Sequence, residues 1–318
     1  MTNEENRIPP IEPVQVDADE LMAKYDKESA YRRLTGFPSK LVFGICVLWS
    51  IVQLYTGLFG TFPSTLQRAP HIAAAMTLVY LLYPIKGKST KITGHVPFYD
   101  YLLALACVFV GAYHVVMYDE LLLRAGSYNQ MDIVVSCMAI LLLLEAARRV
   151  AGTVVVSIGS AFLLYAFFGH LIPRGLFLFH ARFSFRRVVC TEWLSTEGIL
   201  GAPIYVSSTF IFLFLVFATF LKASGVGDWM TGLATAACGG AVGGPAKAAV
   251  VASALQGTIS GSSVANVVST GSVTIPLMKK TGYPPYFAGA VEAAASTARS
   301  GSSNSVNRGC RAASPDYT

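Results

Sequence analysis

Long apolar runs separated by short charged segments are the feature of this sequence that most restricts how it can fold. Most runs approach the roughly 20 residues that a helix needs to cross a bilayer. The runs cover 41–62, 71–85, 98–118, 131–147, 151–171 and 203–221. Because the run at 71–85 is short, we expect its helix to begin a few residues earlier or to tilt against its neighbours.

The overall composition also favours an all-α, polytopic integral membrane protein. Of the 318 residues, 53% are hydrophobic and 13% are charged, whereas soluble domains carry roughly 25% charged residues. The net charge of +6 comes from basic residues that lie between apolar runs instead of forming one patch. We therefore expect the lipid bilayer, and not nucleic acid, to be the partner of these basic residues.

The basic clusters predict how the chain is oriented in the membrane. One cluster precedes the first run, a second follows 71–85 and a third follows 131–147. Since cytoplasmic loops are enriched in Lys and Arg, this arrangement predicts a cytoplasmic N-terminus. The arginines of 172–200 break the rule, because that segment would lie outside. We expect it to hold an amphipathic helix in the membrane interface, anchored by Trp193.

The residue composition changes after Lys222. From 225 to 296, Gly, Ala, Ser and Thr dominate, and such small residues let helix backbones approach closely in membranes. Here an apolar run at 248–255 leads into a Gly/Ser-rich stretch at 257–263, and a second arm returns to Pro276. Each arm is too short to cross the bilayer, so we predict a re-entrant hairpin.

The tip of this hairpin, "ISGSSVANVV" at 259–268, is rich in neutral oxygen atoms. Ser and Thr hydroxyls, an Asn carbonyl and backbone carbonyls at a Gly-rich tip can replace the hydration shell of a small hard cation. They do so without placing a full charge in the membrane. The alternative is that the small residues pack between helices and that their hydroxyls bond back to the chain. The spacing alone leaves both possibilities open.

Other residues carry fewer functional signals. Glu292 lies on an apolar run, and an intramembrane carboxylate is a functional candidate, although the residue can also lie near an interface. Glu145 precedes Arg148 and Arg149 at helical spacings, which predicts an ion pair at the membrane boundary. The sequence has no G-x-S-x-G, no Walker A motif and no His/Cys cluster with metal-ligand spacing. We therefore expect neither an enzyme nor an ATP-driven pump.

Two stretches resemble a known transporter family. They are "GGPAKAAVVASALQGTISGSSVANVVSTGSVTIPLMKKTGY" at 243–283 and "STEGILGAPIYVSSTFIFLFLVFATFLKASGVGDW" at 195–229. Both look like the fused membrane permease of tripartite ATP-independent periplasmic (TRAP) transporters, in the branch that works with TAXI-type binding proteins. The resemblance is strong over about 192–297. The amino-terminal runs agree with the family's small four-helix subunit in layout only.

The resemblance implies an elevator-type secondary transporter in a bacterial or archaeal cytoplasmic membrane. It would import an organic anion, expected to be a carboxylate, with sodium as the coupling ion and no other cofactor. A periplasmic TAXI-type solute-binding protein would deliver the substrate. The family also places a sodium site in the first hairpin of the large domain. On this chain the matching candidates are Ser260, Gly261, Ser262, Ser263, Asn266 and Thr270.

These inferences divide the chain into five parts. We expect a cytoplasmic tail at 1–39, a four-helix module at 40–150, a linking helix and interfacial segment at 151–200, an incomplete large-subunit transport domain at 201–297 and a disordered tail at 298–318.

The carboxyl-terminal sequence departs from the family pattern. The family continues after "EAAAST" with a Gly-Gly-Gln stretch and a second, inverted hairpin, whereas this chain reads "ARSGSSNSVNRGCRAASPDYT". Because a transport site between two repeats needs both of them, we expect this chain alone to be inactive in transport. Two alternative functions remain: a non-transporting membrane remnant or scaffold, and another sodium-coupled elevator carrier that needs no binding protein.

Overall fold

The computed structural model describes residues 31–85, 92–93, 95–173, 178–259 and 263–300. In this part of the chain the fold is helical, apart from a two-residue parallel pair formed by β1 (Arg33–Leu34) and β2 (Ile92–Thr93). Four helices among the described residues are long and apolar enough to cross a membrane. They are Phe37–Phe59, Phe98–Val116, Thr153–Leu171 and Ala202–Ala223. The prediction of an all-α polytopic membrane protein is confirmed.

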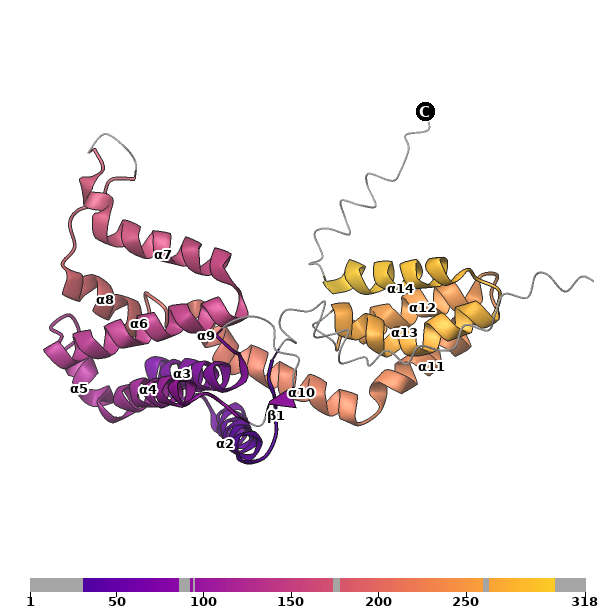
Figure 1. The fold of residues 1–318 in the computed structure, drawn as a ribbon, viewed down its shortest axis with the longest axis horizontal. Helices are drawn as coiled ribbons and strands as arrows, with labels where there is room; N and C mark the ends of the chain where they lie inside the picture. The colour runs from indigo at the N-terminus through magenta and orange to yellow at the C-terminus, as the bar shows by residue number, and fades with distance from the viewer. Residues whose placement is uncertain (1–30, 86–91, 94, 174–177, 260–262, 301–318) are drawn as a thin grey trace, which may run out of the picture.

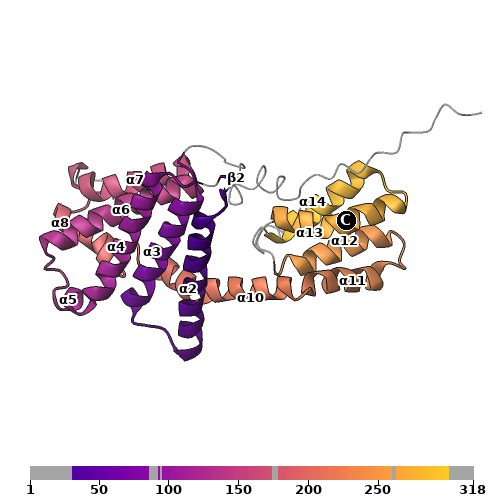
Figure 2. The same cartoon turned by 60° about the horizontal axis from the view of Figure 1, so that its bottom comes forward.

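The helices form two lobes, which Figures 1 and 2 show from different sides. The first lobe contains α2 (Phe37–Phe59), α3 (Ser64–Leu82), α4 (Phe98–Val116), α5 (Tyr118–Leu123), α6 (Gln130–Val150), α7 (Thr153–Phe168), η1 (Gly169–Leu171) and α8 (Phe185–Leu194). The second contains α11 (Val226–Cys238), α12 (Gly244–Gln256), α13 (Ser263–Lys280) and α14 (Pro285–Ser300). Between them runs a helix made of α9 (Ala202–Val206), the π-helical η2 (Ser207–Ile211) and α10 (Phe212–Ala223).

The helix ends differ from the predicted runs by a few residues. α2 begins at Phe37, four residues before the predicted run, because Pro38 fits the first turn of a helix. α3 begins at Ser64, so the short run at 71–85 is extended toward its amino-terminal end and the helix has 19 residues. The tail predicted at 298–318 begins inside α14, which continues to Ser300. Residues 301–318 and 1–30 lie outside the described residues.

Close packing of α3 against α4 forms the centre of the first lobe. A Cβ atom built on Gly111 of α4 would lie only 2.7 Å from the Cβ atom of Ala73 on α3. Glycine is therefore needed for the two helix backbones to approach this closely. Beside this contact Met76, Tyr80 and Val110 are buried.

The outer surfaces of several helices are apolar, as expected for contact with lipid. α7 consists almost entirely of apolar residues, yet it has no buried residue. α2 also exposes large side chains such as Phe43 and Leu58. A helix that is apolar on all sides requires an apolar solvent, so these surfaces agree with the membrane assignment.

The helix predicted within 172–200 exists as α8, but its apolar face meets protein. Trp193 is fully buried and belongs to the hydrophobic core of the first lobe. The prediction that Trp193 anchors the helix in the membrane interface is therefore wrong. An amphipathic period shows that one face is apolar, and it does not distinguish a lipid surface from the side of α6, against which α8 packs.

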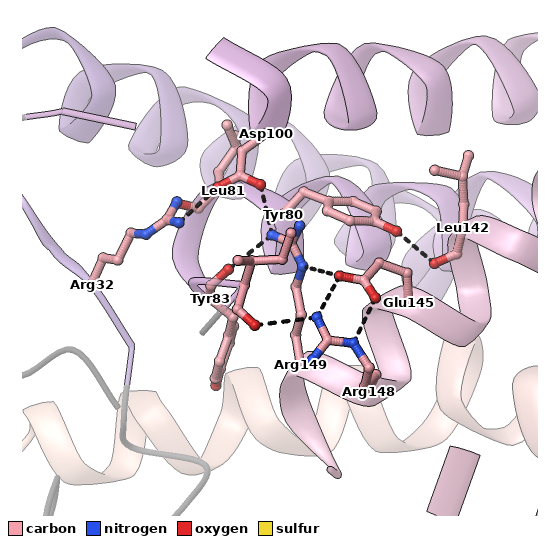
Figure 3. Close-up of polar contacts among 10 residues, drawn as sticks. Arg32, Tyr80, Leu81, Tyr83, Asp100, Leu142, Glu145, Arg148 and Arg149 are labelled. Atoms are coloured by element: carbon pink, nitrogen blue, oxygen red, sulfur yellow. Dashed lines mark hydrogen bonds and ion pairs between the residues drawn. The ribbon is translucent and has the colours of Figure 1, made fainter. Parts of the chain in front are cut away.

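A buried ion-pair network connects the amino-terminal segment with α4 and α6, as Figure 3 shows. The Asp100 carboxylate on α4 is fully buried. Its Oδ2 accepts a hydrogen bond from Arg32 Nη2 at 2.7 Å, and its Oδ1 accepts one from Arg149 Nη1 at 2.8 Å. Two arginines on the same carboxylate compensate the desolvation of its charge and fix the positions of three chain segments.

The same network confirms the ion pair predicted for Glu145. Its Oε2 accepts a hydrogen bond from Arg148 Nε at 2.7 Å, and its Oε1 accepts one from Arg149 Nε at 2.9 Å. The guanidinium of Arg149 also lies 4.6 Å from the centre of the Tyr80 ring. Glu145 therefore takes part in a structural network at the end of α6.

We expect Asp100→Asn to lower the free energy of unfolding by about 3–5 kcal/mol, because two buried guanidinium groups lose their shared carboxylate. The matched control is Glu120→Gln, which removes an exposed carboxylate 3.2 Å from Arg124 and should cost about 0–1 kcal/mol. SDS titration in mixed micelles measures both. Equal losses in the two variants would contradict a stabilising role for the buried network.

Candidate functional site

The predicted hairpin is present in the second lobe as two helices. α12 has 13 residues and α13 has 18, so at 1.5 Å per residue they are about 20 and 27 Å long. A bilayer core is about 30 Å thick, and neither helix is among the candidate membrane spans. α14 packs against both arms of the hairpin, and α11 packs against α12.

Three of the six predicted cation ligands can be placed. Ser260, Gly261 and Ser262 lie outside the described residues. Ser263 is the first residue of α13 and is partly exposed. Asn266 and Thr270 lie one turn apart on α13 and are each 1% exposed. The structure therefore brings two of the candidates together inside the lobe.

The buried carboxylate of Glu292 on α14 lies beside these two residues. Its Oε1 accepts hydrogen bonds from Thr270 and from Ser253 Oγ, the latter at 2.5 Å. Its Oε2 accepts one from Thr274 Oγ1 at 2.7 Å. The carboxylate is thus held by hydroxyls from both arms of the hairpin. We call the group the Glu292 cluster; it comprises Ser253, Asn266, Thr270, Thr274, Glu292 and Ser296.

Asn266 contributes an acceptor that is not used. Its Nδ2 donates a hydrogen bond to the backbone carbonyl of Ser253 at 3.0 Å. Its Oδ1 is buried and has no hydrogen-bond partner among the described residues. An unpaired buried carbonyl is costly, and a carbonyl oxygen is a ligand that hard cations prefer. Asn266 therefore offers a free ligand at the edge of the cluster.

Small residues bring the helices close enough to form the cluster. Ala248, Ala249 and Ala252 form a fully buried face of α12. On α13, a Cβ atom built on Gly271 would lie 3.2 Å from Glu292 Cγ. The Gly- and Ala-rich composition of the region therefore lets α14 approach α13 closely enough for Glu292 to reach the hairpin hydroxyls.

The charge of the cluster is not compensated by the protein. No described side chain forms an ion pair with Glu292, and its hydrogen-bond donors are neutral hydroxyls. Burial of a carboxylate without a counter-charge is costly, and hydroxyl donors lower this cost without removing the charge. A monovalent cation or a proton would make the cluster neutral. The geometry is therefore suited to binding a single positive charge.

Sequence reasoning identified Asn266, Thr270 and Glu292 separately and missed Ser253, Thr274 and Ser296. A signal for part of the set is present in the spacing. Asn266, Thr270 and Thr274 follow one another at intervals of four residues, which places them on one face of a helix. Which other helix would face this stripe could not be read from the sequence.

Residues 138–299, slightly more than half of the chain, match the family described as "Tripartite ATP-independent periplasmic transporter, DctM component". The chain belongs to this family. The matched segment contains the whole Glu292 cluster. The resemblance to TRAP permeases is thus confirmed at the level of the DctM component, which is part of a membrane transporter and not an enzyme.

Two relatives share part of this region. The chain is 42% identical over 78 residues to the "C4-dicarboxylate TRAP transporter large permease protein DctM" of Rhodobacter capsulatus; the match covers 24% of this chain and 18% of that protein. It is 40% identical over 72 residues to the uncharacterized protein y4mL of Sinorhizobium fredii (strain NBRC 101917 / NGR234), covering 23% and 17%. The chain thus spans less than a fifth of the length of either relative. No solved structure matches it.

We expect Ser253→Ala and Thr274→Val each to lower the free energy of unfolding by about 1–3 kcal/mol, because each removes a donor from a buried carboxylate. Ser272→Ala is the matched control on α13: its side chain is exposed and its loss should stay within about 0.5 kcal/mol. SDS titration in mixed micelles again measures the free energy of unfolding of all three variants. If Ser272→Ala lowered the free energy of unfolding as much as the other two, the cluster would contribute no more to stability than an exposed hydroxyl does.

Proposed function

We propose that this chain is a permease component of a sodium-coupled TRAP transporter that imports an organic anion, expected to be a carboxylate. Membership of the DctM family supports the transporter assignment. The Rhodobacter capsulatus relative is named a C4-dicarboxylate permease, which favours a carboxylate substrate. The motifs at 195–229 and 243–283 favour delivery by a periplasmic TAXI-type binding protein. The chain would lie in a prokaryotic cytoplasmic membrane with its N-terminus in the cytoplasm.

The observation that carries the proposal is the position of Asn266 and Thr270 in the Glu292 cluster. Both residues are buried where two hairpin arms and α14 meet, and Asn266 Oδ1 is unpaired. Hydroxyl and carbonyl oxygens are ligands suited to sodium. In this proposal Asn266 and Thr270 bind the ion, and Ser263 with the tip residues 260–262 completes the candidate set.

The two-lobe arrangement supports an elevator mechanism in which the second lobe moves and the first lobe stays fixed. Figure 2 shows α10 as the connection between the lobes. The proposed domain division follows: the four-helix module at 40–150 and the segment at 151–200 belong to the fixed part, and the transport part begins within 201–297.

Polar contacts at η2 agree with a fixed attachment of the connecting helix to the first lobe. Gln67 Nε2 on α3 donates a hydrogen bond to the Ser208 carbonyl at 3.2 Å, and His71 Nε2 lies 3.1 Å from Ser207 Oγ. Gln53 on α2 joins the same group, with its Nε2 2.7 Å from His71 Nδ1. The connecting helix is therefore attached by η2 to two helices of the first lobe.

We expect Asn266→Ala to weaken sodium binding at least tenfold, which corresponds to about 1.4 kcal/mol, since it removes a ligand oxygen. Isothermal titration calorimetry of the purified chain in lipid nanodiscs, with choline chloride as the ionic-strength control, measures the affinity. Ser272→Ala, outside the cluster on the same helix, should bind as the unchanged chain does. Equal affinity of Asn266→Ala and the unchanged chain would rule out the proposed sodium site.

Transport itself needs a second experiment. Proteoliposomes that contain the chain are given a TAXI-type binding protein loaded with a labelled carboxylate, with or without an inward sodium gradient. Because we expect this chain alone to be inactive in transport, the expected result is no uptake by the chain by itself. Uptake that depends on both the binding protein and the gradient would overturn that expectation and show that this chain transports. Uptake without the binding protein would favour another sodium-coupled carrier.

A further inference from the structure

A polar cavity in the first lobe lies where the amino-terminal ends of α6 and α8 meet. Its volume is about 550 Å³, which is within the range of small-ligand sites. The lining comes from the turn before α6 and from α8 with its N-cap, and it includes Ser127, Tyr128, Ser184, Arg186, Arg187 and Thr191. The proposed sodium site is in the second lobe, so it gives this cavity no role.

Two arginines in the lining lack a counter-charge from the protein. Arg186 and Arg187 are exposed, and neither forms an ion pair with a described carboxylate. Arg187 Cζ lies 5.2 Å from the centre of the Phe183 ring, which restricts where this guanidinium can lie. A planar guanidinium can donate two parallel hydrogen bonds to a phosphate group. The pair is therefore suited to a phosphate.

Hydroxyl groups supply the rest of the polar lining. Ser184 Oγ accepts a hydrogen bond from the backbone N–H of Arg187 at 3.3 Å, and its own proton has no acceptor among the described residues. Ser127 and Thr191 add two further hydroxyls. The lining contains no carboxylate, so an ammonium group bound here would find no counter-charge. The cavity therefore favours a phosphate whose remaining groups are neutral and hydroxylated.

The cavity lies at the level where a candidate membrane span ends. That span is Thr153–Leu171, and Figure 1 shows α8 beside α6 and α7. Phe167 in the last turn of α7 stacks on Phe185, with ring centres 5.5 Å apart, and Phe185 directly precedes Arg186. Leu171 is exposed, as expected for contact with lipid. Because headgroups lie just beyond the hydrocarbon core, the two guanidinium groups are at headgroup depth.

The side of the membrane makes these arginines unusual. α6 begins beside the cavity and ends at Arg148 and Arg149, which belong to a cluster expected to be cytoplasmic. In that orientation the cavity is on the outer side, where Lys and Arg are less frequent. A bound lipid phosphate gives a physical reason for arginines that depart from the positive-inside pattern.

We propose that this cavity binds the headgroup of an anionic phospholipid of the phosphatidylglycerol type. The phosphate lies between Arg186 and Arg187, and the glycerol hydroxyls bond with Ser127 and Thr191. The acyl chains extend along α7, whose apolar residues are not buried by protein. The lipid thereby joins the turn before α6, α8 and the membrane. This inference goes beyond the proposed function and does not rest on it.

Native mass spectrometry of the full chain, delipidated in maltoside micelles, measures the binding. Dioleoyl phosphatidylglycerol and dioleoyl phosphatidylcholine are added separately, because they share acyl chains and differ in the headgroup. We expect the phosphatidylglycerol to bind about tenfold more tightly or better, since the choline ammonium meets two arginines and no carboxylate. Glycerol phosphate, which lacks acyl chains, should not displace the lipid at equal concentration.

The variant that combines Arg186→Gln and Arg187→Gln removes both guanidinium groups from the cavity. It should weaken phosphatidylglycerol binding by about tenfold or more, because charge-assisted hydrogen bonds are lost. The matched control combines Arg182→Gln and Lys222→Gln. Both of these residues are exposed and outside the cavity lining, so the control removes the same charge and should bind as the unchanged chain does.

Ser127→Glu tests the same cavity if the double arginine variant does not fold, as judged by circular dichroism. Ser127 is exposed and precedes α6, so a larger side chain is tolerated there. The new carboxylate would lie beside two intact guanidinium groups and occupy the position of the lipid phosphate. Phosphatidylglycerol should then bind no better than phosphatidylcholine.

Equal affinity of the unchanged chain for the two phospholipids overturns the inference, and so does a loss in the control as large as in the double arginine variant. Displacement of the lipid by glycerol phosphate at equal concentration also overturns it, because the cavity would then bind a soluble phosphate. Equal phospholipid affinities together with docking of a binding protein that the double arginine variant weakens would assign the cavity to that protein instead.

Discussion

The contact of Glu292 with hydroxyls from two helices is the interaction on which the second lobe depends. A buried carboxylate must be satisfied from several directions, and here the donors come from α12 and α13. This is possible only because Gly271 and the alanines of α12 keep the three helices close together. The small-residue composition, the hairpin and the polar cluster are therefore three aspects of one packing arrangement.

A comparison of two of the fully buried carboxylates, Asp100 and Glu292, clarifies what each one does. Asp100 is held by two arginines, so its charge is compensated by the protein and its position is fixed. Glu292 is held by neutral hydroxyls, so its charge is stabilised and remains uncompensated. The first arrangement joins segments of the chain permanently. The second leaves the carboxylate without a counter-charge among the described residues.

The family match covers only part of the described structure. The matched residues, 138–299, include the connecting helix and the second lobe, whereas most of the first lobe precedes them. The polar contacts of η2 join these regions, because Gln67 and His71 bind serines of the connecting helix. A π-helical turn is often found at functional sites. Here the π-helical η2 is where the connecting helix is attached to the first lobe.

The sequence by itself determined the membrane class, the positions of the apolar helices, the existence of the hairpin and the Glu145 ion pair. These features follow from local properties: run length, helical spacing and the sizes of consecutive side chains. It also singled out Asn266, Thr270 and Glu292 as functional candidates, because polar residues are costly in an apolar membrane region. Only the tertiary structure decided that Trp193 faces protein, and that Ser253 and Thr274 meet Glu292. A helical period specifies which face of a helix is apolar or polar, but the partner of that face is set by the packing of helices distant in sequence.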